Sequence, residues 1–384
     1  MQKVHLGFNM IYLDHASSSK VEEQFVEAAQ NMLPRFFANP NAQHMLAHEV
    51  NMAMENSRKK IAKLFQRSPN EVIFTASGSE ANNLAIKGIA LANMKKGKHI
   101  ISVKTEHLSV LNSLEYLREI HHFDIDYCHV DQFGNIDIDE LSKLIREDTI
   151  MVSMMAVNNE IATIMPIQAI QTLLKEKSRK IVFVVDGVAG VGKIDHTIFD
   201  VDVFTFSQHK LGGLSGSGCV VKKQHIEMIP LIHGGQQEHA LRAGTPFAIA
   251  NILLADVLEH ALHQQKSQQQ RIIELNNYLI SKLQHDFSCK IVSSITGSPY
   301  IVSFIQENVH SSVILNGLSA QHVYVSSHSA CASQTTSVSH VLLACGYSES
   351  EASKMIRVSF HYDTSIEEVD GFLQAYKKVQ MYVK

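Results

Sequence analysis

The sequence predicts an α/β protein with a mostly parallel, doubly wound sheet and a smaller C-terminal α/β domain. Short apolar runs of strand length alternate with amphipathic helical segments through about residue 221. Polar residues follow the ends of several of these runs, which is where open α/β sheets bind ligands. Beyond residue 250 a long helical pattern leads into a second segment of mixed strands and helices.

The first hundred residues predict two strands, three helices and a short extended entry at residues 11–14. Apolar residues at helical spacing predict helices over 21–33, 50–64 and 81–94, and β-branched and aromatic runs predict strands over 72–74 and 99–103. Between the strand at 72–74 and the helix at 81–94 lies Thr-Ala-Ser-Gly-Ser-Glu. This arrangement can receive a phosphate on backbone N–H groups, with Gly78 and Ser79 as the expected contacts. An N-cap formed by Ser77 or Ser79 is the alternative.

Two further predicted strands end in polar side chains. The strand at 99–103 leads to His107, and the strand at 150–157 leads to Asn158 and Asn159. The imidazole of His107 could stack on a flat cofactor ring or simply lie at the start of a helix. The two amides are suited to hydrogen bonding with an oxygen of a ligand.

An acid and a lysine follow the next two predicted strands. The apolar run at 181–185 ends in Asp186, and the run at 201–206 ends in Ser207, Gln208, His209 and Lys210 before a glycine-rich loop. In a parallel sheet both ends face one crevice. A lysine there can form a Schiff base with pyridoxal phosphate, while a carboxylate keeps the ring nitrogen protonated. The alternative is a capping aspartate and an exposed lysine.

A nucleotide-binding loop is a weaker interpretation of the same region. Residues 187–193 fit the first seven positions of a phosphate-binding loop, but Ile194 stands where that loop requires a Ser or Thr hydroxyl. We therefore do not expect nucleotide binding here.

Composition excludes several other classes of protein. The 384 residues are 45% hydrophobic and 19% charged with a net charge of −4, so neither a nucleic-acid partner nor a disordered chain is indicated. The five cysteines include no CxxC pair, and no ligand spacing organises the 22 histidines, so no metal site is expected. No signal peptide or membrane-spanning run is present, and we expect a cytoplasmic location.

The C-terminal part contains a candidate nucleophile and a candidate anion-binding residue. A helix over 249–283 precedes predicted strands at 300–304 and 355–360 and helices at 312–318, 337–343 and 366–382. Cys331 lies in a run of small polar residues that is poorly suited to core packing, whereas Cys345 follows a packed helical pattern. Arg357 lies within a strand, which suggests a carboxylate ligand or a buried salt bridge.

Taken in order, these residues resemble the cysteine desulfurases, which are class V, fold-type I pyridoxal-phosphate enzymes. The resemblance covers nearly the whole chain and begins at Ile11, so it leaves the natural start at Met1 or Met10 open. The matching segments are Tyr-Leu-Asp at 12–14, Phe-Thr to Glu at 74–80 with 82–87, Thr-Glu-His at 105–107, Val-Asn-Asn-Glu at 157–160, Val-Asp at 185–186, Ser to Lys at 207–210, Arg to Thr at 242–245, Ser-Ala-Cys at 329–331, and Arg357.

The resemblance implies a role for each of these positions and a division into two domains. Cofactor binding is assigned to Gly78, Ser79, His107, Asn159, Asp186, Ser207, His209, Lys210 and, from the second subunit of a homodimer, Thr245. Catalysis would use Lys210, His107 and Cys331, whose thiol would receive the sulfur of L-cysteine as a persulfide and release L-alanine. Arg357 and Asn159 would bind the substrate. A large domain would span 15–250, and a small domain with the cysteine loop would span 1–14 and 251–384.

The resemblance also implies that sulfur passes to an acceptor protein for iron–sulfur clusters or tRNA thiolation. Four departures bear on activity: Ala189 replaces a Gln near the ring hydroxyl, Ala156 replaces a His, Gln208 replaces a Gly, and His361 with Tyr362 replaces a Gly-Arg pair. A class V lyase or transaminase for another amino acid, and a degenerate desulfurase acting as a binding scaffold, remain alternatives.

Overall fold

The computed structural model describes residues 10–178, 180–307, 309–327 and 338–382. The strands are β1 (Ile11–Tyr12), β2 (Val72–Thr75), β3 (His99–Val103), β4 (Asp124–Cys128), β5 (Thr149–Met155), β6 (Val182–Asp186), β7 (Val203–Ser207), β8 (Gly218–Lys222), β9 (Lys290–Ile291), β10 (Ile301–Ile305), β11 (Val323–Tyr324) and β12 (Met355–Ser359). The helices are α1 (Glu23–Met32), α2 (Met45–Leu64), α3 (Gly78–Asn93), α4 (Leu108–His121), α5 (Ile138–Leu144), α6 (Ile167–Lys177), α7 (Ala248–Phe287), α8 (Ser311–Ser319), α9 (His340–Ala344), α10 (Glu349–Ala352) and α11 (Ile366–Tyr382).

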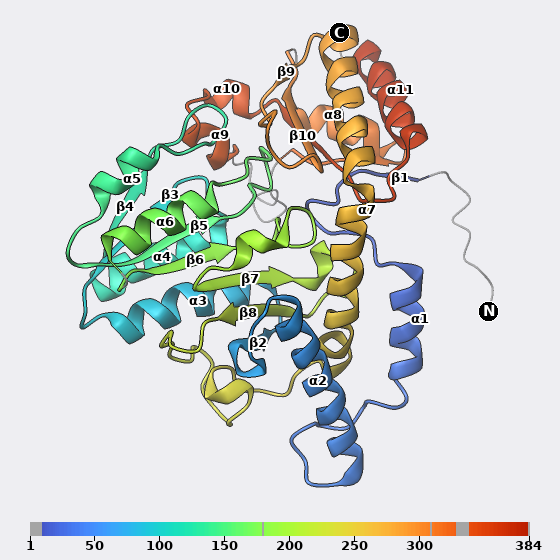
Figure 1. Cartoon of the computed structure of the whole chain (residues 1–384). Helices are drawn as coiled ribbons and strands as arrows, with labels where there is room; N and C mark the ends of the chain where they lie inside the picture. Colours follow the sequence, from blue (N-terminus) through green and yellow to red (C-terminus); the bar gives the residue numbers. More distant parts are fainter. Residues whose placement is uncertain (1–9, 179, 308, 328–337, 383–384) are drawn as a thin grey trace.

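A seven-stranded sheet forms the centre of the molecule, and it confirms the predicted fold class (Figure 1). Its strand order is β2-β8-β7-β6-β5-β3-β4. The strands from β7 to β4 are parallel, whereas β8 is antiparallel to both β7 and β2. The sequence analysis did not name β4 or β8 as strands. The antiparallel β8 follows the glycine-rich loop, and its pairing depends on contacts with distant residues.

Alternate residues of the central strands enter two different cores. Val152 and Phe204 belong to the core that includes α2, α6 and the first part of α7. Their neighbours Met151 and Val203 belong to the core formed with α3 and α4. Because successive side chains of a strand point to opposite faces, both faces of the sheet are covered by helices, and the buried strands are therefore apolar throughout.

A smaller unit lies at the C-terminal end of α7 (Figure 1). Its three-stranded antiparallel sheet has the order β12-β10-β9. The 40-residue helix α7 connects the units, because Leu258 packs in the sheet core and Leu279 packs in the core of the smaller unit. The domain division at residue 250 remains a prediction, but the change of core occurs within α7.

The N-terminal segment belongs to the smaller unit before it crosses to the large sheet. Strand β1 pairs in parallel with β11, and Asp14 forms a bridge with Ser359. Ser19 then donates its backbone N–H to the carbonyl of His209 at 2.8 Å. Residues 14–19 therefore lie between the smaller unit and the end of β7. Among the described helices, none has the length and apolar character required to cross a membrane.

Candidate active site

One pocket gathers most of the residues that the sequence analysis singled out. It lies where the C-terminal ends of β5, β6 and β7 meet the N-termini of α3 and α4, and β12 contributes Arg357 from the smaller unit. Of the predicted residues, it is lined by Gly78, Ser79, His107, Asn159, Asp186, His209, Lys210 and Arg357. Ala16, Ser17, Ser77, Asn82, Ser109, Met155, Val188 and Ala189 complete the lining.

Asp186 is the buried acid of this pocket. It is the last residue of β6, and only 5% of its surface is exposed. Its Oδ1 accepts the N–H of Val188 at 2.9 Å, and its Oδ2 accepts from Asn82 Nδ2 at 2.7 Å. Asn82 in turn donates to Ser109 and accepts from the hydroxyl of Thr205 at 2.5 Å. This network fixes the plane of the carboxylate that faces the pocket.

Lys210 lies across the pocket with its amine in a desolvated environment. Desolvation lowers the pKa of Lys210 to about 7, and the positive charges of Arg357 and Lys193 act in the same direction. The amine donates to the carbonyl of Ser17 at 2.7 Å and also to that of Ala16. An amine with this pKa is about half neutral near pH 7, and the neutral form can attack an aldehyde as a nucleophile.

The N-terminus of α3 forms an anion-binding turn beside this lysine. A Cβ on Gly78 would lie 2.8 Å from Val188 Cγ2 and 3.3 Å from Ser207 Cβ, so only glycine fits without displacement. Ser77 caps the helix by accepting the N–H of Glu80 at 3.1 Å. The backbone of Gly78 and Ser79 is therefore open to the pocket at the positive end of a 16-residue helix.

Ser207 lies behind the pocket and orients His209. Its hydroxyl is 2.7 Å from His209 Nδ1 and donates to the carbonyl of Ser217 at 3.2 Å. Desolvation, followed by the charge of Lys210, lowers the pKa of His209 to about 4, so its imidazole is neutral at physiological pH. The predicted direct contact of Ser207 with a phosphate would require a change in these hydrogen bonds.

His107 lies at the start of α4 and serves as its N-cap. Its Nδ1 accepts the N–H of Ser109 at 3.1 Å and lies 2.8 Å from the hydroxyl of the same residue. Burial lowers the pKa of His107, so the ring is neutral. The ring caps a helix and also lines the pocket, so its stacking on a cofactor ring stays a prediction.

Arg357 forms the buried ion pair that the sequence analysis gave as one of its two alternatives. Its Nη2 donates to Asp14 Oδ1 at 2.8 Å and to the Ser17 hydroxyl at 2.7 Å, and its Nη1 donates to the carbonyl of Asn159 at 2.8 Å. Its Nε is buried without a hydrogen-bond partner among the described residues. Arg357 therefore lines the pocket with two N–H donors, on Nε and Nη1, that no described residue accepts.

Of the two amides after β5, Asn159 lines the pocket and Asn158 does not. Asn158 is buried, and its side chain accepts the N–H groups of Glu160 and Ile161 and donates to the carbonyl of Thr105. It therefore stabilises the turn that presents Asn159 to the pocket.

Of the residues in which this chain departs from the family pattern, one lines the pocket and two others are buried outside it. Ala189 lines it, so the missing amide leaves pocket space. Ala156 is buried in the core beneath, where its N–H donates to the carbonyl of Asp186 at 2.8 Å. Gln208 is fully buried, and its amide group, oriented to donate, lies 3.2 Å from the carbonyls of Leu214 and Ala250. The Gln at 208 therefore points away from the site.

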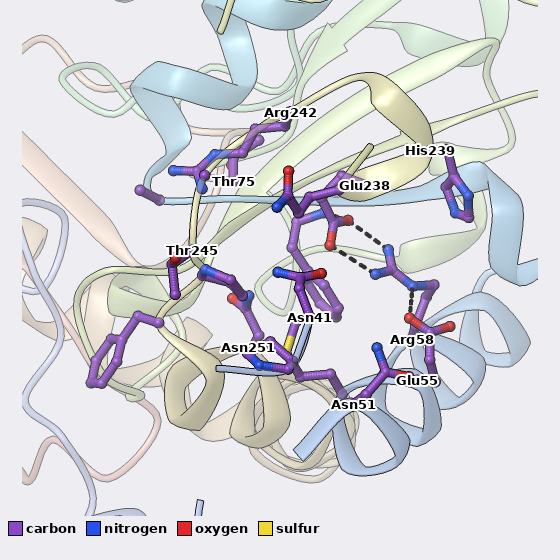
Figure 2. Close-up of a pocket in the computed structure, with 18 of the residues that line it drawn as sticks. Asn41, Asn51, Glu55, Arg58, Thr75, Glu238, His239, Arg242, Thr245 and Asn251 are labelled. Atoms are coloured by element: carbon purple, nitrogen blue, oxygen red, sulfur yellow. Dashed lines mark hydrogen bonds and ion pairs between the residues drawn. The ribbon is translucent and has the colours of Figure 1, made fainter. Parts of the chain in front are cut away.

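Thr245 lies in a second, polar pocket of about 480 Å³ (Figure 2). At its far wall the guanidinium of Arg58 donates to both carboxylate oxygens of Glu238, at 2.7 and 2.9 Å. Glu238 Oε2 also accepts the N–H of Phe74 at 2.8 Å, which anchors the loop that bears Thr245 to β2. Thr245 does not line the pocket of Lys210 in the same chain.

Cys331 lies outside the described residues. Cys345 is buried, as expected, and burial raises its pKa to about 12. Burial also raises the pKa of the other three described thiols, at positions 128, 219 and 289. None of these four is a thiolate at neutral pH, which leaves Cys331 as the candidate nucleophile.

The sequence analysis missed three residues beside the pocket. Asn82 appeared only as part of a matching segment, and its bond to Asp186 has no signal in sequence spacing. Glu106 is fully buried, and neither of its carboxylate oxygens has a hydrogen-bond partner of good geometry among the described residues. Burial and then the charge of Asp186 raise its pKa well above the usual range. Desolvation lowers the pKa of the third residue, Lys193, to about 8.

The residues of the pocket fit pyridoxal phosphate. Gly78 leaves a cradle at a helix N-terminus that a Cβ would fill, and Asp186 presents an oriented carboxylate in the same pocket as an amine whose pKa is lowered to about 7. When bound, this cofactor supplies an electron sink for the substrate's Cα. Lys210 would hold its aldehyde carbon, Asp186 its ring nitrogen, and the α3 turn with His209 its phosphate.

The fold and this pocket define a class V aminotransferase. The chain belongs to the aminotransferase class-V family, whose model matches residues 11–372, and this family uses pyridoxal phosphate.

Within this family the chain is similar to cysteine desulfurases, which confirms the resemblance seen in the sequence. It is 35% identical to "Cysteine desulfurase IscS" of Dictyoglomus turgidum over 96% of this chain and 94% of the relative. Its fold matches a solved "NIFS-LIKE PROTEIN" with a TM-score of 0.90 and 32% identity, covering 97% of this chain and all of that one. A structure described as "SspA in complex with cysteine" matches with a TM-score of 0.78 and 30% identity, over 91% and 98% of the two chains.

Proposed function

We propose that this chain acts on L-cysteine with pyridoxal phosphate, releases L-alanine, and keeps the sulfur as a persulfide on Cys331 for transfer to an acceptor protein. The observation that carries the proposal is the placement of Lys210 and Asp186 in one pocket with Arg357. One relative is a cysteine desulfurase by name, and one similar protein was solved in complex with cysteine. These findings support L-cysteine as the substrate.

In this proposal some residues bind the substrate and others transfer a proton or the sulfur. Arg357 and Asn159 bind and orient the amino acid through its carboxylate, and Lys210, with its lowered pKa, accepts or returns a proton near pH 7. The thiolate of Cys331 attacks the substrate sulfur, and the C–S bond breaks. Its electron pair stays with the amino-acid carbon, which takes up a proton, so cysteine and the enzyme thiol become alanine and the enzyme persulfide.

The test is an assay of the purified protein with pyridoxal phosphate and L-cysteine that follows alanine and sulfide together in the presence of a reductant. Equimolar products that Lys210→Ala and Cys331→Ser each abolish are expected. A lyase or transaminase for another amino acid would leave Cys331→Ser largely active. A binding scaffold would form neither product, and its partner binding would survive Lys210→Ala.

We further propose that a homodimer completes each site with Thr245 of the other subunit. In support, Thr245 lies in the pocket of Figure 2 rather than beside Lys210 of its own chain. Thr245→Ala and Lys210→Ala homodimers should each be impaired. Heterodimers formed by mixing the two variants contain one site with both residues intact, so activity above the sum of the separate variants is expected. Simple addition would contradict the shared site.

For the sulfur acceptor, we propose a protein that builds iron–sulfur clusters or thiolates tRNA, as the family resemblance implies. Purified persulfide-loaded protein, prepared with ³⁵S-cysteine, would be mixed with candidate acceptors of each kind. Label transfer to one kind and not the other would assign the pathway, and transfer to neither would remove this part of the proposal.

A further inference from the structure

A row of aromatic rings lies next to the chain segments that flank Lys210, and none of its rings lines the pocket. The ring centroids of Tyr12 and His15 are 4.9 Å apart, and His15 stacks on His361 at 5.0 Å with an interplanar angle of 20°. His361 contacts Tyr362 at 4.0 Å, and Tyr362 is followed by His260 at 5.7 Å. The row therefore connects β1, the turn after β12, and the first half of α7.

The centre of this row touches the backbone on both sides of the lysine. His15 directly precedes the two carbonyl groups, at residues 16 and 17, that accept hydrogen bonds from the amine of Lys210. On the other side, a Cβ on Gly212 would lie 3.3 Å from His361 Nε2, so the imidazole packs closely against the chain just beyond Lys210. One ring of the stacked pair thus directly precedes the carbonyl groups that bind the amine, and the other packs against the chain two residues beyond the lysine.

The pair is buried, and one of its rings is oriented by a carboxylate. His15 and His361 are each 5% exposed. His361 Nδ1 lies 2.6 Å from Asp363 Oδ1, and this carboxylate fixes the orientation of the ring. Burial, followed by the neighbouring His361, lowers the pKa of His15 to about 3, so the stack contains a neutral ring throughout the physiological range.

We propose that the His15–His361 stack is a positioning device for Lys210, which presses residues 15–19 over the amine and keeps water from it. By the family resemblance, His361 and Tyr362 stand where the cysteine desulfurases have a Gly-Arg pair, so one ring of the device, His361, is a residue in which this chain departs from that pattern. The proposal rests on the role of Lys210 as the cofactor lysine. His361 and His15 are positioning residues, because neither of them lines the pocket.

The expected consequence concerns the protonation of Lys210. The charged groups that act on this amine are Arg357 and Lys193, which lower its pKa, and Asp14 and Asp186, which raise it. Around His361 itself the titratable neighbours are His15, Asp363, Tyr362 and Glu22. Loss of the stacked ring leaves the four groups around the amine in place but admits water, so desolvation weakens and Lys210 should hold its proton more strongly.

The experiment compares His361→Leu, which has a similar volume but no ring, with His361→Phe, which keeps a ring able to stack. Competitive acetylation of the cofactor-free protein across pH, followed by mass spectrometry, measures the titration of Lys210. In His361→Leu the lysine should titrate about one pH unit higher than in wild type, and His361→Phe should restore most of the difference. The visible absorbance of bound pyridoxal phosphate, titrated against pH in the holoenzyme, should shift in parallel.

The control is His310→Ala, which removes the N-cap hydrogen bond of α8 without touching the site. It should lower stability and leave the titration of Lys210 unchanged. If His361→Leu folds and Lys210 titrates as in wild type, or if His361→Phe fails to rescue it, the stack is only packing and the proposal is overturned. Should His361→Leu fail to fold, His15→Leu tests the other ring of the same pair with the same readouts.

The two proposals can fail separately. A wild-type protein that develops no Lys210-dependent absorbance with pyridoxal phosphate would contradict the proposed function, while acetylation would still test the stack. Conversely, if the holoenzyme is active but Lys210 titrates at the same pH in wild type and in His361→Leu, the proposed function stands and the positioning role of His361 is removed.

Discussion

Asn82 donates a hydrogen bond to Asp186 at 2.7 Å and thereby fixes the carboxylate at the base of the pocket. This contact joins the second turn of α3 to the end of β6, and the hydroxyl of Thr205, in the middle of β7, donates to the same Asn82 side chain. Because α3 also carries the turn at Gly78, a single helix positions both the acid and the anion-binding backbone.

We therefore expect Asn82→Ala to weaken pyridoxal phosphate binding by about tenfold, because Asp186 loses a charge-assisted hydrogen bond. Titration of the cofactor-free protein, followed by visible absorbance, measures the change. Asn83→Ala is the matched control, since that side chain, within the part of the chain that the structure describes, donates to the carbonyl of Ser79 and does not bond to Asp186. Equal affinities for wild type and Asn82→Ala would show that the contact does not matter for the cofactor.

Glu106→Gln should stabilise the protein at neutral pH and not in acid. Burial raises the pKa of Glu106 in the folded state. In the unfolded chain this carboxyl has its ordinary pKa, so it loses its proton at a lower pH there than in the folded protein. The free energy of unfolding of the wild type, compared with that of Glu106→Gln, is therefore unchanged below about pH 4. Above that pH it falls by up to about 1.4 kcal/mol for each pH unit, until the pKa of the folded state is reached. Denaturant unfolding of both proteins from pH 4 to 8 measures this difference, and a constant difference would contradict the buried neutral acid.

Arg58→Met should lower the free energy of unfolding by about 3 to 5 kcal/mol, because it leaves the carboxylate of Glu238 buried without its partner. The two side chains are only 4% and 7% exposed. The matched control is Lys60→Met, which breaks an ion pair with Asp256 whose side chains are 58% and 46% exposed and should cost less than about 1 kcal/mol. Similar losses in the two variants would argue against a special role for the buried pair.

Ala240→Gly should stabilise the loop that bears Thr245. Glu238, His239 and Ala240 have φ angles of 49°, 56° and 63°, a run of left-handed backbone without glycine. Glycine relieves the strain at 240 but costs chain entropy, so the net gain should be about 0.5 to 1 kcal/mol. Ala243→Gly, at a position without a positive φ, should instead be destabilising in the same unfolding assay. A loss at both positions would contradict the argument.

Much of the site was predictable, because an apolar run followed by polar residues shows where a strand ends, and the site lies at strand ends. Asp186 and Lys210 follow apolar runs, and parallel strands bring such ends together, so their meeting in one pocket required no knowledge of packing. The turn at Gly78 was likewise predictable, because a strand, small residues and a helix follow one another directly. Gln208 shows the limit of this reasoning, since the sequence marked it as a departure and only the fold showed that it points into the core.

Local properties of the chain were enough to predict the fold class and the edge of the sheet where the polar residues gather, because periodicity and strand-end chemistry depend on neighbouring residues. The family was predicted from the resemblance of the motifs, taken in order, to those of a known family. Which distant groups act on one another depends instead on tertiary packing. Asn82 meets Asp186 across 104 positions and Arg357 meets Asp14 across 343, and no spacing rule reports such contacts. The low pKa of Lys210 and the stack of His15 on His361 have the same origin, because burial and proximity arise only when the two units close around residues 14–19.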